Sequence, residues 1–209
     1  MENIKKQVIS QMDGIFHHVV WTITPRPVWI VGTCNENGTP NFSTITCVSN
    51  TPGPPETIIL SMIAKQTIAN IQRTGEFSVH LANTEMAALA DYVGSVTGVD
   101  GMKDAMPYDF AWGEKARVPV LGASPCVVEC KVSHTHEVGE FQTFFGEVLN
   151  LHLDEKLNPP MDSREVMMEW FQELDVRKVD PLVYHSAKKY YRVGEKLQMK
   201  RDSHEKGGQ

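Results

Sequence analysis

The sequence predicts a mainly β protein with peripheral helices, arranged as an antiparallel barrel. Short segments rich in Val, Ile and Thr recur along the chain, and Gly, Pro and Asn turns separate them. Only a few segments show the helical spacing of apolar residues, and most of these lie between strands. No Gly-x-Gly-x-x-Gly or Walker-type loop joins a strand to a helix, which argues against Rossmann and P-loop folds.

The first half of the chain reads as strands joined by short turns. Asn35 to Gly38 ends in Asn-Gly, the strongest short hairpin signal, and Gly75 follows a helical pattern as a stop signal. Pro and Gly at residues 51–55 predict a loop. We therefore expect a short amphipathic helix over residues 2–14, an extended piece over 19–24, strands over 27–34, 41–49, 57–62 and 76–81, and helices over 65–74 and 84–93.

The second half predicts two long strands and one good helix. Residues 94–116 read as a loop because they are rich in glycine. Ser163 is a suitable N-cap for a helix over residues 163–174, whose apolar face carries Met167, Trp170, Phe171 and Leu174. The other expected elements are strands over 125–136, 141–153 and 183–193, with a turn at 137–140.

Length and charge restrict the class of protein. At 209 residues we expect one domain over residues 1–195, followed by a polar C-terminal tail over 196–209. A net charge of −6 argues against a nucleic-acid partner, since phosphate backbones are bound by basic surfaces. No apolar run is long enough to span a bilayer, and the N-terminal segment does not read as a signal peptide. These features predict a cytoplasmic protein with no membrane partner.

Cys126 and Cys130 invite a metal-site interpretation because His134 and His136 also occupy even-numbered positions of the same stretch, so all four side chains would point to one face of a strand. Strands rise about 3.3 Å per residue, so the two cysteines would lie roughly 13 Å apart and His136 roughly another 20 Å on. Neither a disulfide nor one tetrahedral metal site can join such distant groups. We therefore predict no metal site and regard these cysteines as small apolar residues.

Hydroxyl groups and a lysine gather between residues 41 and 70. The strand at 41–49 carries Thr44 and Thr46, and Lys65 and Thr67 stand at the start of the next helix. A helix start favours an anion, because its first amides have no partner within the helix. Two explanations remain open here: the threonines serve β-propensity and helix capping alone, or they bind a phosphate.

The chain resembles the flavin reductase-like family, including the flavoredoxins, over about residues 18–195. The likeness lies in the order of several short motifs, which are Thr24–Val28, Gly38–Asn41, Lys65–Ile71, Gly75–Val79 with Leu81, Pro125–Cys130, Gly146–Val148, Pro181–Tyr184 and Lys189–Gly194. The resemblance implies an FMN-binding split β-barrel, FMN as cofactor and a homodimer. The family often has Asp where this chain has Gln66.

The resemblance also implies the site residues. Thr44, Thr46, Lys65 and Thr67 are expected to contact the phosphate or the ribityl chain. The ribityl chain or the ring would be lined by Cys47, Ser61 and Met62, and two further candidates are Asn70 and Arg26. No catalytic side chain is assigned, although His185 lies in the C-terminal segment that resembles the cofactor side of the family.

The implied function is that of an FMN-binding oxidoreductase or electron-transfer protein. It would act either as a flavoredoxin that passes electrons to or from a redox protein, or as an NAD(P)H-dependent flavin reductase. The alternative is a non-enzymatic flavin or small-molecule binding module on the same barrel, because a fold does not fix a function.

Overall fold

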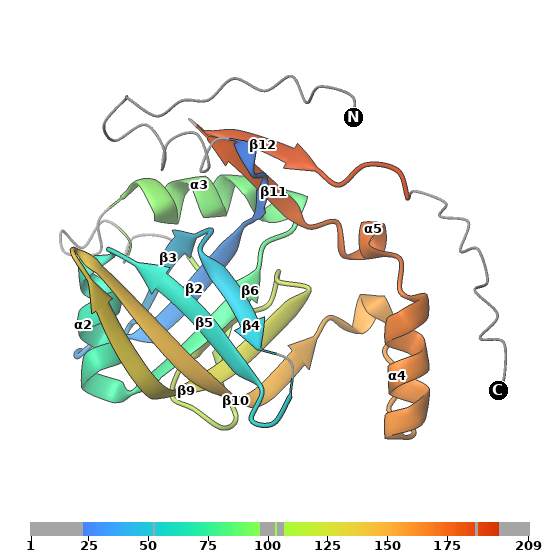
Figure 1. Cartoon of the computed structure of the whole chain (residues 1–209), viewed down its shortest axis with the longest axis horizontal. Helices are drawn as coiled ribbons and strands as arrows, with labels where there is room; N and C mark the ends of the chain where they lie inside the picture. Colours follow the sequence, from blue (N-terminus) through green and yellow to red (C-terminus); the bar gives the residue numbers. More distant parts are fainter. Residues whose placement is uncertain (1–22, 52, 97–102, 104–106, 187, 197–209) are drawn as a thin grey trace, which may run out of the picture.

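The computed structural model describes residues 23–51, 53–96, 103, 107–186 and 188–196 (Figure 1). The strands are β1 (Arg26–Pro27), β2 (Trp29–Cys34), β3 (Pro40–Ile45), β4 (Val48–Thr51), β5 (Thr57–Met62), β6 (Glu76–Leu81), β7 (Phe110–Trp112), β8 (Pro119–Leu121), β9 (Cys126–Val138), β10 (Phe141–Leu153), β11 (Leu182–Ser186) and β12 (Lys189–Arg192). The α-helices are α2 (Lys65–Thr74), α3 (Ala87–Ser95), α4 (Arg164–Glu173) and α5 (Val176–Val179).

The centre of the molecule is one antiparallel sheet in the order β3-β2-β6-β9-β10-β5-β4. Its two edge strands, β3 and β4, are consecutive in the chain and are separated only by Thr46 and Cys47. Two residues span only a few ångströms, so the sheet must curl until its edges come close together. The result is a curled, half-closed antiparallel barrel, which confirms the predicted class.

Two hydrophobic cores lie on opposite faces of this sheet. Successive residues of a strand point to opposite faces, and Ile30 and Val31 of β2 accordingly enter different cores. Ile30 packs with Phe42 and with Ala90 of α3, whereas Val31 packs with Phe77 and other residues of the barrel interior. Helix α3 therefore covers one face, as Figure 1 shows, and carries part of the first core.

The smaller sheets extend the barrel. The C-terminal hairpin β11–β12 pairs with β1, and the short β7–β8 hairpin forms a third sheet. Val28 connects β1 to β2 through two backbone bonds, because its amide donates to Leu182 O and its carbonyl accepts from the Ala82 amide. The strand predicted over residues 27–34 is therefore two strands that belong to different sheets.

Many predicted bounds are confirmed. The strands at 57–62, 76–81 and 141–153 and the helix at 65–74 have the predicted limits. Gly38 has φ +82° in the hairpin turn, and Gly75 has φ +71° at the end of α2, so both hold backbone conformations that suit glycine. The predicted helix at residues 2–14 lies outside the described residues.

Three further predictions about single elements are wrong. The strand predicted over residues 41–49 is divided into β3 and β4, because the chain passes there from one sheet edge to the other. The strand predicted over 183–193 is the hairpin β11–β12, in which Lys188 has φ +61°. Of the extended piece predicted over 19–24, Ile23 and Thr24 are described, the first as helical and the second as a bend, while residues 19–22 lie outside the described range.

The remaining helices and loops differ less from the predicted elements. Residues 84–93 begin as a 3₁₀ turn, Thr84–Met86, which the Asn83 side chain caps by accepting from the Met86 amide, and α3 follows. The segment predicted as a loop at 94–116 contains β7. Ser163 caps α4 as predicted, since its hydroxyl accepts from the Val166 amide. None of the α4 residues is buried, however, so its apolar face does not pack into the core.

Candidate functional site

A cavity of about 680 Å³ opens where several elements end. It lies between the end of β3, the end of β5, the start of α2, the end of α3 and the β11–β12 hairpin. Small-molecule sites typically measure about 300–1,000 Å³ and combine apolar walls with a few polar groups. The volume of this cavity therefore suits a cofactor-sized ligand.

Seven of the nine predicted site residues line this cavity, and they come from three separate segments. They are Thr44, Thr46, Cys47, Ser61, Met62, Lys65 and Thr67. The other two, Arg26 and Asn70, are not among the lining residues. The structure thus brings together the hydroxyls and the lysine that the sequence singled out.

The start of α2 forms one polar wall of the cavity. Ala64 is the N-cap and makes no side-chain cap bond, and the first backbone bond of the helix runs from the Ile68 amide to Ala64 O. The amides of Lys65, Gln66 and Thr67 therefore lack partners within the helix and favour an anion beside them. Thr67 lies inside the first turn of α2, so it does not cap the helix. The predicted capping role of Thr67 is therefore wrong.

The hydroxyl groups differ in what they can offer a ligand. Thr44 Oγ1 donates to Ala90 O at 2.7 Å, so its hydrogen is already used to hold α3 against β3. Gly94 of α3 permits this close approach, since a Cβ there would lie 3.0 Å from Thr44 Cβ. Ser61 Oγ accepts from Thr143 Oγ1 at 3.0 Å, which leaves its own hydrogen for another acceptor.

Three lysines and one carboxylate give the cavity a positive balance in a chain of net charge −6. Lys65 is exposed, whereas Lys103 is only 5% exposed and its Nζ donates to Phe42 O at 2.6 Å. Burial lowers the pKa of Lys103 to about 8. Lys188 lies 3.6 Å from Asp91, which partly neutralises it. The cavity therefore favours an anionic ligand.

The β11–β12 hairpin closes the cavity on the side of α3. Tyr190 OH donates to Asp91 Oδ1 at 3.1 Å, and the Tyr184 and Tyr190 rings lie 5.4 Å apart. Burial, followed by the neighbouring Asp91 carboxylate, raises the pKa of Tyr190 to about 12, so the phenol stays protonated near neutral pH. His185 does not line the cavity, and its ring packs against Tyr191 instead.

Several lining residues were not assigned from the sequence. They are Asp91, Lys103, Tyr184, Lys188 and Tyr190, among others. Tyr184 and Tyr190 lie within motifs that carry the family resemblance, and that signal could have identified them. Lys103 lies in a glycine-rich segment, where no periodic pattern marks a site.

The two predicted residues outside the lining lie beside it. Asn70 is buried in α2, where its Nδ2 donates to Thr33 Oγ1 at 3.0 Å and Asn35 Oδ1 at 2.8 Å. Arg26 lies near Cys47, a lining residue. Burial raises the pKa of the Cys47 thiol, and the positive charge of Arg26 opposes that rise. Both residues therefore support the wall of the cavity.

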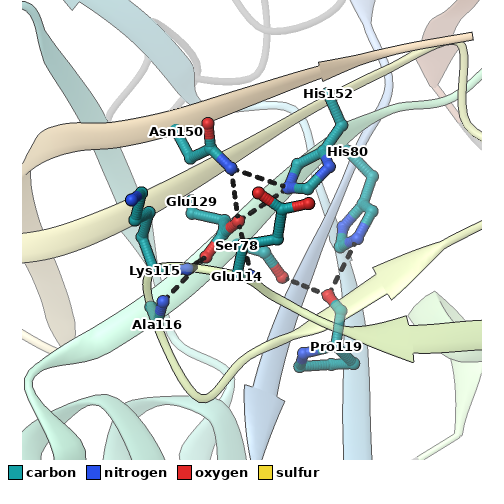
Figure 2. Close-up of polar contacts among 9 residues, drawn as sticks. All are labelled: Ser78, His80, Glu114, Lys115, Ala116, Pro119, Glu129, Asn150 and His152. Atoms are coloured by element: carbon teal, nitrogen blue, oxygen red, sulfur yellow. Dashed lines mark hydrogen bonds and ion pairs between the residues drawn. The ribbon is translucent and has the colours of Figure 1, made fainter.

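A second polar cluster lies outside this cavity, around the buried carboxylate of Glu129 (Figure 2). Its oxygens accept from the amides of residues 114–116 at 2.8–3.1 Å, from Asn150 Nδ2 at 3.1 Å and from His152 Nε2 at 2.6 Å. Burial alone would raise the pKa of Glu129, but the bonds from His152, Asn150 and the loop amides hold it at about 2. This cluster fixes the loop before β8.

Metal-binding clusters and membrane-spanning helices are both absent from the part of the chain that the structure describes. No group of three or more His, Cys, Asp or Glu side chains is placed to hold a metal ion. No described helix has both the length and the apolar character needed to cross a bilayer. Cys130 lies in the barrel core and Cys126 packs against it, and burial raises their thiol pKa values to about 12 and about 11.

Known proteins share this fold. A flavoredoxin from Methanosarcina acetivorans is 23% identical, with a TM-score of 0.74 over 95% of this chain and 97% of its own. The 2-nitrobenzoate 2-nitroreductase of Pseudomonas fluorescens is 19% identical, with a TM-score of 0.75 over 96% and 98% of the two chains. At these identities the likeness shows the fold, which is the split barrel of flavin proteins.

Two sequence comparisons bear on the family. An uncharacterized protein of Deinococcus radiodurans is 27% identical over 146 residues, and the match spans 64% of each chain. The model of the flavin reductase like domain matches residues 21–194, which is most of the chain and includes every predicted site residue. This protein therefore belongs to the flavin reductase-like family.

Proposed function

We propose that this protein binds FMN in the 680 Å³ cavity and acts as a flavin-dependent oxidoreductase or electron-transfer protein. One observation carries the proposal. In a chain of this family, a single cavity joins a helix start and lysine side chains to apolar walls. That combination suits a ligand with a phosphate at one end and a flat, largely apolar ring at the other.

The residues present fit FMN at both ends. Lys65, the free amides at the start of α2 and the Thr67 hydroxyl offer positive charge and donors to a phosphate. Ile45, Met62 and Val93 offer apolar surface to a ring. Ser61 and Thr46 also line the cavity and offer polar groups to a ribityl chain.

FMN, when bound, supplies the redox chemistry, because flavins take up hydride and exchange single electrons. The side chains of this protein bind and orient it. The α2 start and Lys65 neutralise the phosphate charge, and the β11–β12 hairpin restricts access of water from one side. Tyr190 remains a neutral phenol that donates to Asp91, so this contact holds the hairpin in place without adding charge to the cavity.

The visible absorption spectrum of the purified protein is the first test. A flavin band that survives gel filtration supports tightly bound FMN and the electron-carrier version of the proposal. The flavoredoxin from Methanosarcina acetivorans, which shares the fold, is an example of a protein named for that role. A colourless protein that accelerates NAD(P)H oxidation when FMN is added supports the reductase version. FMN binding without electron transfer to any acceptor supports a binding module. Failure of added FMN to bind at micromolar protein would overturn the proposal.

We further propose that the protein is a homodimer that uses helix α4. Val166, Met168 and Phe171 on this short helix are 40–49% exposed, and no α4 residue is buried. Figure 1 shows α4 standing at the side of the barrel. Because large apolar side chains gathered on one helix mark an interaction surface, a second copy of the chain is the partner that we propose for it.

A further inference from the structure

Asn41 connects the hairpin β2–β3 to the start of α2 beneath the cavity. The residue is 2% exposed, and its Nδ2 lies 3.0 Å from Thr33 Oγ1 and 3.0 Å from Thr67 Oγ1. Thr67 is itself 1% exposed and lines the cavity, whereas Asn41 does not. Asn41 therefore reaches the cavity only through the hydroxyl of Thr67.

The direction of the Thr67 hydroxyl follows from this contact. A hydroxyl has one hydrogen to donate and can accept through its lone pairs. Asn41 Nδ2 donates to Thr67 Oγ1, so the hydroxyl hydrogen must point away from Asn41. Within the described residues Thr67 Oγ1 donates to no protein acceptor. Its hydrogen is thus available to a ligand in the cavity.

The surrounding network fixes the orientation of the Asn35 and Asn70 amides. Asn35 Nδ2 donates to Pro40 O at 3.5 Å, and a carbonyl can only accept, so Asn35 Oδ1 must face Asn70. Asn70 Nδ2 then donates to Asn35 Oδ1 and to Thr33 Oγ1. Thr33 and Asn41 are opposite each other in the β2–β3 register, which sets the place of the Asn41 amide.

We infer that Asn41 is a positioning residue that holds the Thr67 hydroxyl as a donor toward the phosphate of FMN. The inference rests on the proposed function and adds a basis for selectivity between phosphorylated and unphosphorylated flavins. A hydrogen bond to a charged acceptor is about twice as strong as a neutral one, so fixing one donor in advance favours FMN over riboflavin.

The test compares FMN and riboflavin affinities by quenching of flavin fluorescence. Asn41→Leu and Thr67→Val are each expected to weaken FMN binding roughly five- to tenfold, as for a lost hydrogen bond to a charged group. Riboflavin affinity should stay within about twofold, because riboflavin lacks the phosphate. The double variant should bind FMN no more weakly than Thr67→Val alone, since Asn41 acts through that hydroxyl.

Asn35→Leu is the matched control. Asn35 belongs to the same network, because its Oδ1 accepts from Asn70, but no hydrogen bond joins it to Thr67 and it does not line the cavity. A purely structural effect of the network would therefore appear in both variants and for both flavins. Asn35→Leu should leave the ratio of FMN to riboflavin affinity unchanged.

The results of these titrations distinguish failure of the proposed FMN binding from failure of the proposed role of Asn41. If the wild-type protein binds no FMN, the proposed function fails. If it binds FMN but Asn41→Leu keeps the wild-type ratio, or the two substitutions weaken FMN binding additively, the role of Asn41 is overturned. Should Asn41→Leu fail to fold, Asn41→Ser replaces it, because serine is too short to reach Thr67 and is judged by the same ratio.

Discussion

The carboxylate of Glu129 lies 2.6 Å from Nε2 of His152, and the Glu129 side chain is completely buried. The same carboxylate accepts from three consecutive amides of the loop at residues 114–116, as Figure 2 shows. Gly113 is needed beside it, because a Cβ there would lie 2.5 Å from Glu129 Oε2. A single buried acid thus ties together β9, β10 and the loop before β8.

Glu129→Gln should destabilise the protein by about 3 kcal/mol, which lowers Tm by roughly 10 °C in a chain of this length. The amide of glutamine would face loop amides that need acceptors, so donors would be left unpaired in the interior. Thermal unfolding followed by circular dichroism measures the change. Glu114→Gln, an exposed acid in the same loop, is the control that should leave Tm unchanged. Equal Tm values for wild type and Glu129→Gln would contradict this role.

His80 should make stability fall between pH 7 and pH 5. The ring is fully buried, with Nδ1 2.8 Å from Ile30 O and Nε2 3.1 Å from Pro119 O, and burial lowers its pKa to about 4 despite these carbonyls. Because the folded pKa lies below the ordinary value of 6.5, the unfolded chain binds the proton first as pH falls. The expected loss between pH 7 and pH 5 is about 2 kcal/mol.

Urea unfolding at several pH values measures this loss, and His80→Asn should flatten the profile over that interval. Glu129 contributes at lower pH, since its stabilisation is lost as pH falls from 4.5 through its folded pKa of about 2. His80 and Glu129 therefore change the stability in separate pH ranges. An NMR titration that gave the His80 ring a pKa of 6 or more in the folded protein would contradict the first prediction.

Gly146 lies where a larger residue cannot fit. A Cβ at this position would be 2.3 Å from Cζ of Phe77, a fully buried core ring, and 2.9 Å from Cβ of Cys130. Gly146→Ala should therefore cost about 1–3 kcal/mol through overpacking. Gly194→Ala is the control, because a Cβ there meets nothing within 4 Å. Phe77→Leu should recover part of the loss in the double variant, and an unchanged urea midpoint for Gly146→Ala would contradict the packing.

Local signals explain how much of the fold could be predicted. Helix α2 has the predicted limits because Gly75 provides its left-handed end, and β10 does because a turn precedes it at Gly139. The division between β3 and β4 at Thr46 was missed because it depends on sheet closure. The β-propensity of the chain around Thr46 does not change where it crosses between sheet edges.

The candidate site could likewise be predicted only where local sequence signals mark it. Thr44, Thr46, Lys65 and Thr67 stood out because they lie close together in sequence around the hairpin and the α2 start, and the family resemblance then implied their role; the structure shows that they line one cavity. Lys103 was missed because it reaches the cavity from a segment 36 residues beyond Thr67, with no motif of its own. Which hydroxyl hydrogens remain free depends on tertiary partners such as Ala90 O, and sequence alone cannot supply these.

The proposed dimer predicts a change in mass. Met168→Glu combined with Phe171→Glu should convert the dimer to a monomer at micromolar concentration, because two charges would be buried in an apolar contact. Sedimentation velocity measures the mass. Gln172→Glu, at an exposed position of the same helix, should leave the dimer intact. A wild-type protein that sediments as a monomer, or a doubly substituted one that stays dimeric, would remove α4 from the interface.

Lys103 should make flavin affinity depend on pH. Its ammonium is buried beside the cavity, it donates to Phe42 O, and burial lowers its pKa to about 8. Since the charged form exists below that pKa, FMN affinity should fall as pH rises from 7 to 9. Lys103→Met keeps the length and apolar stem of the side chain, so it should weaken FMN binding several-fold at pH 7 and abolish this decline. Fluorescence titrations at each pH measure the FMN affinity, with Lys156→Met, on the 3₁₀ turn Glu155–Leu157 after β10, as control. A decline that persists in Lys103→Met would assign the titrating group elsewhere.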